Sequence, residues 1–399
     1  MNQDLEKLLY ENKFTEAAEM VNTGHKLPKT LLPHQLSQIF DNLFKAEQYE
    51  LILHFVKDKT IETDIYEFDN FERSVFQTVE RHLKTDENGL TFFRDFISRF
   101  ENLNDEVSTQ TLLGYFLEKL VSADLIKILI ETGCNVNFKN NAEETYIHQI
   151  IRNNQRRYDL DDEALNDLKI SYINIFLDEG LDINAENIVG KTPLIQAIES
   201  NKPKLIAFLM EHGADANHLD KTGNSAFFYA VAHLQSVEMY AKMSAFTQPQ
   251  LDVLNKDQVT ILFDYLRMIS PSANGILLLK KLIEDGADLY QPSIYYGKEK
   301  TPMDLIAEKP TELLEAIIET GQVDVNRGDD NGNTLLHKVC AFNVNYDASN
   351  AKETYKKVKL LIENGADVSI TNDQDQTALM LASDDNLKIK TVELLMKQS

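Results

Sequence analysis

The stretch GKTPLIQAIESNKPKLIAFLMEHGADAN, residues 190–217, carries the signals that decide the fold. Thr192 followed by Pro193 marks a helix start, because the hydroxyl caps the first turn and proline at the next position has its φ already set. The apolar segment LIAFLM (205–210) ends shortly before Gly213. Glycine is favoured just past a helix because it enters the left-handed conformation without a Cβ penalty. The stretch therefore predicts two short helices followed by a loop or hairpin.

Helix ends of this kind recur along the chain. LIKILIETGCNVN (125–137) and KLLIENGADVS (359–369) repeat the pattern of an apolar helix, an acidic residue and a glycine. QLDVLN (250–255) is a degenerate copy in the longest interval. We predict helix stops at Gly133, Gly180, Gly213, Gly286, Gly321 and Gly365.

Helix starts follow these stops at similar spacing. Each begins with Ser or Thr, whose hydroxyl is suited to cap a helix N-terminus, and Pro193 and Pro302 occupy the next position in two of them. The copies are TYIH at 145, TPLI at 192, SAFF at 225, TILF at 260, TPMD at 301, TLLH at 334 and TALM at 377. Each unit therefore reads as a hairpin, a capped helix, a second helix and a glycine stop.

Residues 108–399 resemble the ankyrin repeat family, whose unit of about 33 residues begins its first helix with T-P-L-H. The resemblance implies an all-α fold, an α-solenoid of about seven to eight helix pairs joined by short hairpin loops. It also implies that His337 and His148 are structural residues that tie the hairpin to the helix start. Cys340 lies three residues after His337 and is expected to pack between helices, which favours architecture over a nucleophile pair or half of a metal site.

Residues 1–107 lack these signals and are expected to form a helical N-terminal region that stacks on the array as a cap. Apolar residues spaced three and four apart favour helices in DLEKLLYEN, TEAAEMVN, ERSVFQTVERHL and FFRDFISRF, among others. The terminal units of a solenoid need a polar outer face. We therefore expect two regions, 1–107 and 108–399, in one continuous rod.

The bulk composition bounds the class of protein. The chain has 399 residues, a net charge of −24 and two cysteines. No apolar run is long enough to span a bilayer and no secretory signal opens the chain, so we expect a mature chain that begins here and stays in the cytoplasm. Its negative charge disfavours nucleic acid and anionic membranes and favours a basic partner, or serves solubility.

Catalytic and metal sites are not indicated. The GKT at 190–192 lacks the glycine five residues earlier that a phosphate-binding loop needs, and the acidic segment YDLDDEALND (158–167) lacks the glycine of a calcium loop. HExxH, CxxC, GxSxG and GxGxxG motifs do not occur. We predict no enzyme activity, cofactor or metal.

Insertions and hairpin tips are the candidate contact surfaces. NNQRRYDLDDEALNDLK (153–169) and FNVNYDASNAKETY (342–355) lie between the helices of their units, and LYQPSIYYGKEK (289–300) lengthens a hairpin. Its Tyr290, Tyr295 and Tyr296 either project as contact anchors or fold back onto their own helices. By position in the repeat, the partner-binding candidates are Ile188, Val189, Lys221, Thr222, Lys256, Asp257, Tyr295, Tyr296, Asp330 and Asn331.

Two functions fit this reading. The first is a non-catalytic module, such as a scaffold, that binds another protein in a concave groove formed by hairpin tips and first helices. The second is an inhibitor or immunity protein that occludes a basic toxin or enzyme. Acidic residues along the groove would favour the inhibitor, because charge complementarity speeds association with a cationic target. In either case we expect a monomer when the protein is free.

Overall fold

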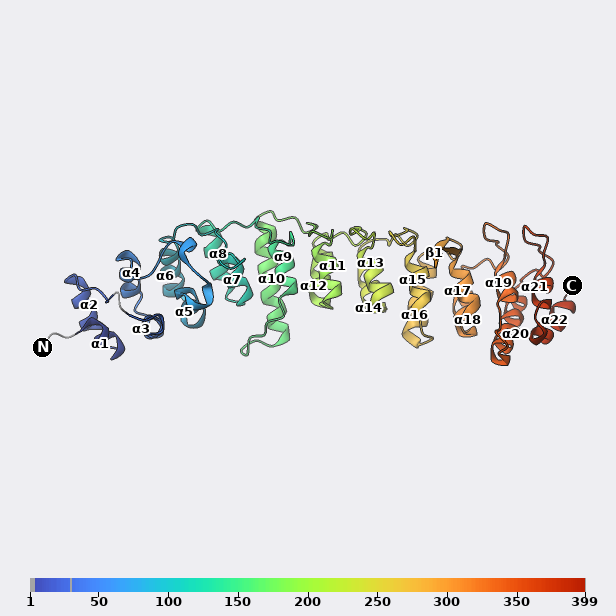
Figure 1. Ribbon diagram of the computed structural model, residues 1–399, viewed down its shortest axis with the longest axis horizontal. Coiled ribbons are helices and arrows are strands. Elements are labelled where there is room, and N and C mark those ends of the chain that lie inside the picture. Colours follow the sequence, from blue (N-terminus) through green and yellow to red (C-terminus); the bar gives the residue numbers. More distant parts are fainter. Residues whose placement is uncertain (1–3, 29–30, 399) are drawn as a thin grey trace. The chain divides into compact units, whose positions relative to one another are not determined.

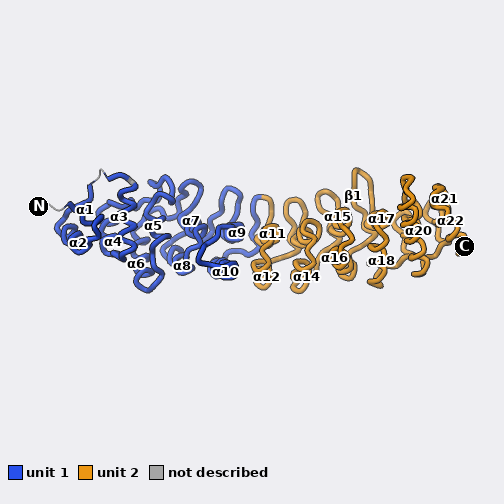
Figure 2. Tube along the Cα trace, turned by 90° about the horizontal axis from the view of Figure 1, so that it is seen from below, with its two compact units in different colours: residues 1–188 blue, residues 189–399 orange. Residues whose placement is uncertain are grey.

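A computed structural model describes residues 4–28 and 31–398. The chain divides into two compact units, residues 1–188 and 189–399, which are treated separately below (Figure 2). Within the described ranges, no helix combines the length and the apolar character that a membrane span requires.

Unit 1 is a stack of helix pairs (Figure 1). In it α3 packs against α1 and α5, and α6 packs against α4 and α8. The elements are α1 (Leu5–Tyr10), α2 (Phe14–Asn22), α3 (Pro33–Lys45), α4 (Tyr49–Lys57), η1 (Ile65–Glu67), η2 (Phe71–Arg73), α5 (Val75–His82), α6 (Glu87–Ile97), α7 (Leu112–Glu118), α8 (Ala123–Glu131), α9 (Tyr146–Arg152) and α10 (Asp162–Asp178). The helices predicted before residue 108 are thus confirmed.

Aromatic side chains join the N-terminal helices to the first repeat. Phe76 on α5 lies with its ring centroid 4.9 Å from that of Phe100 and 6.2 Å from that of Phe116 on α7. All three side chains are buried. Aromatic pairs at such distances are favourable in tilted and edge-to-face arrangements. The N-terminal helices therefore pack against α7 through buried aromatic rings; their role as a cap of the array remains a prediction.

Unit 2 contains six further helix pairs among its described residues. Each first helix contacts the first helix of the next pair, as α15 does with α17 and α17 with α19. The elements are α11 (Pro193–Glu199), α12 (Pro203–Glu211), α13 (Ala226–Phe228), η3 (Tyr229–His233), α14 (Val237–Ser244), α15 (Ile261–Met268), α16 (Ala273–Glu284), β1 (Ser293–Tyr295), β2 (Lys298–Lys300), α17 (Pro302–Glu308), α18 (Thr311–Glu319), α19 (Leu335–Ala341), α20 (Ala348–Glu363), α21 (Ala378–Ser383), η4 (Asn386–Lys388) and α22 (Ile389–Met396). With α7 to α10 of unit 1, the described chain after residue 107 holds eight pairs, and the predicted fold class is confirmed.

The predicted helix starts and stops are also confirmed. The hydroxyls of Ser225, Thr260 and Thr377 accept hydrogen bonds from the backbone N–H three residues later, at 3.2, 3.2 and 3.3 Å. Thr301 instead forms a capping box in which the Asp304 carboxylate accepts its N–H at 2.8 Å. The six predicted glycine stops all have positive φ, between 68° and 110°.

Asparagines clamp several of the hairpins to the hairpin that follows. Asn217 donates from Nδ2 to the Gln248 carbonyl at 2.9 Å and accepts from the Gln250 N–H at 3.0 Å. Asn326 makes the same two bonds three hairpins further on, with the Gly365 carbonyl and the Asp367 N–H. Side-chain amides satisfy backbone groups that the turns leave unpaired. We call this arrangement the asparagine clamp.

The same clamp occurs at Asn104. Its Nδ2 donates to the Gly133 carbonyl at 3.1 Å, and its Oδ1 accepts from the Asn135 N–H at 2.6 Å. The asparagine clamp of the repeats therefore already occurs at Asn104, before the predicted boundary between residues 107 and 108. That boundary remains a prediction, because both sides of it belong to unit 1.

Buried lysines satisfy the carbonyl ends of first helices. Lys357 on α20 is 2% exposed and donates to the Ala307 carbonyl at 2.6 Å, in the last turn of α17. Lys388 is 3% exposed and donates to the Cys340 carbonyl at 2.8 Å, in the last turn of α19. A cation at a helix C-terminus opposes the negative end of the helix dipole. Burial nevertheless lowers the pKa of Lys357 to about 8.

The insertion at 153–169 is only partly a loop. Residues 153–161 form the loop, and residues from Asp162 onward lengthen α10 at its N-terminus. Asp161 caps this helix by accepting the Ala164 N–H at 2.8 Å. The acidic segment 158–167 therefore contains the start of α10, with Asp161 as its cap. The second insertion, residues 342–355, is likewise only partly a loop, because its residues from Ala348 onward belong to α20.

Replacing Gly213 tests the helix-stop assignment. Its φ is +86°, and an added Cβ would meet no atom within 4 Å, so any loss reflects backbone conformation rather than a clash. Gly213→Val should lower the free energy of unfolding by about 1–3 kcal/mol, measured by urea denaturation. Gly213→Asn is the matched control and should cost less, because asparagine tolerates the left-handed region. Equal urea midpoints for wild type and the valine variant would contradict the assignment.

Candidate protein-binding surface

A buried or half-buried Asn or Asp stands at the base of each regular hairpin, five residues before the capping Ser or Thr. Asp220 is typical: its Oδ1 accepts the N–H of Thr222 at 2.8 Å and that of Asn224 at 3.1 Å. Its Oδ2 accepts the Tyr229 hydroxyl at 2.6 Å. The same pair of backbone bonds, to the second and fourth following residues, is made by Asn140, Asn255, Asp329 and Asn372.

This basal residue was missed by the sequence analysis. Its signal is an Asn or Asp at a fixed distance before the helix start, and such residues commonly bond to their own following backbone in turns. Burial alone would raise the pKa of Asp220, but hydrogen bonds from Thr222 and Tyr229 lower it below the ordinary value. Asp220 is therefore an ionised, fully engaged acceptor rather than a site for a ligand.

Backbone hydrogen bonds connect successive hairpin tips in unit 2. The Lys221 N–H donates to the Val189 carbonyl at 3.0 Å, and the Lys256 N–H donates to the Thr222 carbonyl at 2.9 Å. The Ile294 N–H then donates to the Gln258 carbonyl at 2.9 Å. These bonds bring the predicted residues from Val189 to Tyr296 into one continuous line. A separate bond of 3.1 Å, from the Asp373 N–H to the Asn331 carbonyl, joins the last two hairpins.

Nine of the ten predicted contact residues are exposed. In unit 2 these are Val189, Lys221, Thr222, Lys256, Asp257, Tyr296, Asp330 and Asn331. Ile188 is also exposed and lies at the end of unit 1, where its N–H donates to the Ala142 carbonyl at 2.8 Å. Tyr295 is half-buried. Their exposure makes them available for contact, and their role in binding remains a prediction.

The three tyrosines of the long hairpin have different environments. Tyr290 folds back: the Arg327 guanidinium lies 4.0 Å from its ring centroid, and its hydroxyl donates to the Asp324 carbonyl at 2.8 Å. Tyr295 packs on Phe263 at 6.0 Å, with the Arg267 guanidinium 5.4 Å from its ring. Tyr296 is 88% exposed at the tip of the β1–β2 ribbon. Of the three, Tyr296 is thus the one that projects from the hairpin; its role as a contact anchor remains a prediction.

Charges on the first helices are neutralised locally. At α11 and α17 the residue before the capping threonine pairs with the end of the helix, as Lys191 does with Glu199 at 2.6 Å and Lys300 with Glu308 at 2.7 Å. Lys338 bridges Asp304 at 2.9 Å and Asp329 at 2.6 Å. Burial alone would lower the pKa of Lys338, but these two carboxylates raise it. Such pairs contribute little net field to a partner.

The last two hairpins differ because their tips are acidic. Asp330, Asp373 and Asp375 are exposed, and no Lys or Arg occurs between residues 329 and 337 or between 370 and 387. Among the described residues, none of these three carboxylates has a salt bridge. The Asp373 to Asn331 backbone bond holds the two tips side by side. They therefore present a compact negative surface, here named the acidic tips (Asp330, Asp373 and Asp375).

His337 and Cys340 are architectural, as predicted. His337 is 1% exposed, and its Nδ1 accepts the Thr334 N–H at 3.2 Å, so Nε2 carries the proton and donates to the Gln376 carbonyl at 3.1 Å. It thereby joins its own helix start to the next hairpin. Cys340 and Cys134 are buried free thiols, and burial raises the pKa of each to about 12. A thiol of such high pKa is a poor nucleophile.

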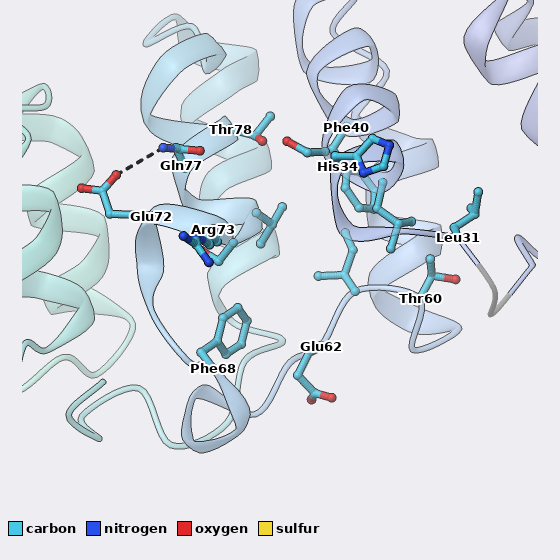
Figure 3. A pocket seen from close by; sticks show the side chains of 15 residues that line it. Leu31, His34, Phe40, Thr60, Glu62, Phe68, Glu72, Arg73, Gln77 and Thr78 are labelled. Carbon is cyan, nitrogen blue, oxygen red and sulfur yellow. Dashed lines mark hydrogen bonds between the residues drawn. The ribbon is translucent and has the colours of Figure 1, made fainter. Parts of the chain in front are cut away.

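A cavity of about 490 Å³ lies in unit 1 between α3, α5 and the segment that connects α4 to α5. Figure 3 shows Phe40, Phe68 and Arg73 among its lining side chains, with Gln77 donating to Glu72 at 3.2 Å on one wall. The Ser74 hydroxyl is engaged as the cap of α5, accepting the Phe76 N–H at 3.1 Å. Over residues 4–28 and 31–398, no cluster of three or more His, Cys, Asp or Glu side chains is placed to hold a metal ion.

Comparisons with known proteins find ankyrin repeats in two stretches of the chain. The family model described as "Ankyrin repeats (3 copies)" matches residues 163–244, and that described as "Ankyrin repeat" matches residues 331–373. Human B-cell lymphoma 3 protein is 24% identical over 212 residues, covering 53% of this chain and 43% of that protein. Ankyrin repeat protein 14 of vaccinia virus is 25% identical, covering 42% of this chain and 70% of that protein.

One solved structure, the ankyrin repeat domain of Bcl-3, aligns at 22% identity with a TM-score of 0.47, covering 62% of this chain and 98% of that one. The chain spans about two fifths of the length of the first curated relatives it matches.

Acidification tests the structural role of His337. Burial lowers its pKa below the ordinary value of 6.5. As pH falls below that value, the unfolded chain takes up a proton that the native histidine resists, so the free energy of unfolding should decrease. His337→Gln cannot titrate and is the control for every other ionising group. Urea denaturation from pH 7 to pH 5 should therefore show wild type losing more stability than the variant; parallel losses would contradict the assignment.

Proposed function

Because this chain is an ankyrin repeat protein, we propose that its function is to bind another protein through the hairpin tips and first helices of unit 2. Ankyrin repeats are protein–protein interaction modules, and extended stacks of repeats offer long surfaces for such contacts. The proposal assigns the contact to the line from Val189 to Tyr296 and to the acidic tips. It includes no catalytic role and no cofactor.

The observation that carries the proposal is the hydrogen-bonded line of exposed tips. Backbone bonds of 2.9–3.1 Å hold neighbouring tips in fixed register, so the backbone of the tips loses little further freedom on binding. Tyr296 adds a large exposed ring, and aromatic side chains are frequent energetic anchors of interfaces. A preorganised row of this kind suits a folded partner or an extended segment.

From the acidic tips we further propose that the partner carries a basic region at this contact. Charges on the first helices are paired within the chain, whereas the carboxylates of Asp330, Asp373 and Asp375 form no salt bridge with any residue that the structure describes. Exposed complementary charges increase the rate of association and fix orientation more than they increase affinity. Nucleic acid is disfavoured as the ligand, because phosphates would be repelled by a chain of net charge −24.

An inhibitor or immunity protein is the second candidate, and the acidic tips favour it. If the basic region of the partner contains its active site, occupation of that region would occlude it. A scaffold would bind without loss of the partner's activity. Monomeric state and cytoplasmic location are parts of the same proposal; the two free thiols are compatible with a reducing compartment.

Removing the acidic tips tests this function. The triple variant Asp330→Asn, Asp373→Asn and Asp375→Asn should lose retention of basic proteins from the native lysate when the tagged full chain is eluted with steps of salt. For an isolated partner, the association rate should fall about tenfold at low ionic strength, and the difference should shrink as salt rises. Addition of wild type to the partner's own assay separates inhibitor from scaffold.

The matched control is Glu211→Gln, Glu312→Gln and Glu315→Gln, which removes three exposed charges from α12 and α18. It should retain the same proteins as wild type. Retention of an unchanged set by the acidic-tip variant would overturn the assignment of the acidic tips. Loss of partners by both variants alike would point to total charge instead.

A further inference from the structure

The loop of residues 153–161 shapes a second cavity, on a part of unit 1 that the hairpins do not reach. Figure 1 shows this loop below α9 and α10, at the helix ends opposite the hairpins of unit 1. The cavity measures about 730 Å³ and lies between this loop, the C-terminal end of α5 and the segment that links α7 to α8. Its charged lining includes Arg81, Lys119, Arg156 and Arg157, with the exposed Tyr158 beside them.

Four cations in one cavity are unexpected in this unit. Residues 1–188 carry 16 of the 24 net negative charges of the chain. The same lining holds the carboxylates of Glu72, Glu80 and Asp159, so the cavity is slightly positive while the unit around it is strongly negative. Cations brought together repel one another unless an anion compensates them.

Two of the cations are compensated within the chain. Lys119 pairs with Glu72, which also accepts from Gln77 on the wall seen in Figure 3. Arg157 pairs with Asp159, and its Nη1 donates to the Leu120 carbonyl at 2.7 Å. Arg81 and Arg156 form no salt bridge or side-chain hydrogen bond with any described residue. They are therefore the two charges available to a ligand.

The loop is anchored so that Arg156 stays at the cavity. Asn153 donates from Nδ2 to the Glu118 carbonyl at 3.1 Å, and Gln155 donates from Nε2 to the Glu118 carboxylate at 2.8 Å. Lys169, 3% exposed, donates to the Asn153 carbonyl. Residues 153, 155 and 157 thus hold the loop to unit 1, and the alternate residues Arg156 and Tyr158 remain exposed. The site is preorganised, which lowers the entropic cost of binding.

We infer that this cavity binds an acidic segment of a protein partner, whose carboxylates pair with Arg81 and Arg156. Guanidinium groups form bidentate bonds with carboxylates, and the Tyr158 ring beside them offers apolar area to the flanking peptide. A nucleic acid fits less well, because every nucleotide carries a phosphate, whereas a peptide can place its carboxylates at the two arginines. The inference concerns unit 1 and is independent of the function proposed for unit 2.

Fluorescence anisotropy with the full chain tests this inference. The probes are fluorescein-labelled peptides of six glutamates, of six glutamines, and of a neutral sequence with two phosphoserines, together with a single-stranded DNA 6-mer. Wild type should bind the glutamate peptide and not the glutamine peptide. The double variant Arg81→Gln and Arg156→Gln should weaken that binding about tenfold or more, since charge-assisted bidentate bonds are lost.

The matched control is Arg73→Gln with Arg94→Gln, two exposed arginines of unit 1 outside this cavity. It should bind the glutamate peptide like wild type, as should the acidic-tip variant of unit 2. Unchanged urea midpoints show that the exchanged side chains are not needed for folding. Equal binding by the double variant, no binding of the glutamate peptide, or binding of the phosphopeptide or DNA alone would each overturn the inference.

Discussion

The basal Asn or Asp of the hairpins is the interaction on which the rest of the structure depends. One side-chain oxygen accepts two backbone N–H groups, and the residue's own N–H donates to the carbonyl four residues on, as in Asp220 to Asn224 at 3.0 Å. A hairpin that is only a few residues long cannot pair these groups by itself, and buried unpaired N–H groups are costly. The basal residue therefore sets both the turn and the position of the helix start that follows it.

Repetition of this unit connects neighbouring hairpins of unit 2 in two runs. Backbone bonds of 2.9–3.0 Å join the hairpins from Val189 to Ile294, and a bond of 3.1 Å joins the last two hairpins. His337 extends the connection inward by bonding to Gln376 of the following hairpin. Side chains at the tips are free to differ, since none of these bonds involves them. Variation of the tips is thus compatible with a constant framework, and the surface changes from lysines and tyrosine in the middle hairpins to carboxylates in the last two.

Much of this architecture could be predicted from the sequence because its signals are local. A glycine with positive φ, a hydroxyl cap and a proline at the next position are properties of single residues, and Gly213, Thr192 and Pro193 are confirmed in those roles. The basal Asn or Asp escaped notice because the same residue types occur in any turn. The environments of the tyrosines also depended on partners distant in sequence. Tyr290 is covered by Arg327, whereas the ring of Tyr296 lies 4.4 Å from that of the adjacent Tyr295 and stays 88% exposed.

The candidate site was only partly predictable for a related reason. The positions of the tips follow from the repeat, but pairing of charges such as Lys338 with Asp304 and Asp329 joins three elements and has no signature in one segment. Likewise, Arg81 and Arg156 are 75 residues apart and meet at one cavity through the stacking of helix pairs. From the sequence, a lysine such as Lys357 is expected at the surface; its burial depends on the Ala307 carbonyl, 50 residues away in the chain, to which it donates.

Hydrogen exchange of the tip amides tests most directly whether the hairpins form a bonded, preorganised row. The N–H groups of Lys221, Lys256, Ile294 and Asp373 lie in exposed or half-buried loops, where free amides exchange at the rate of the unfolded chain. If they donate to the neighbouring hairpins, their exchange in the native chain should be slowed to a degree comparable with the amides of the adjoining first helices. Exchange at the rate measured for the same residues in concentrated urea would contradict the account.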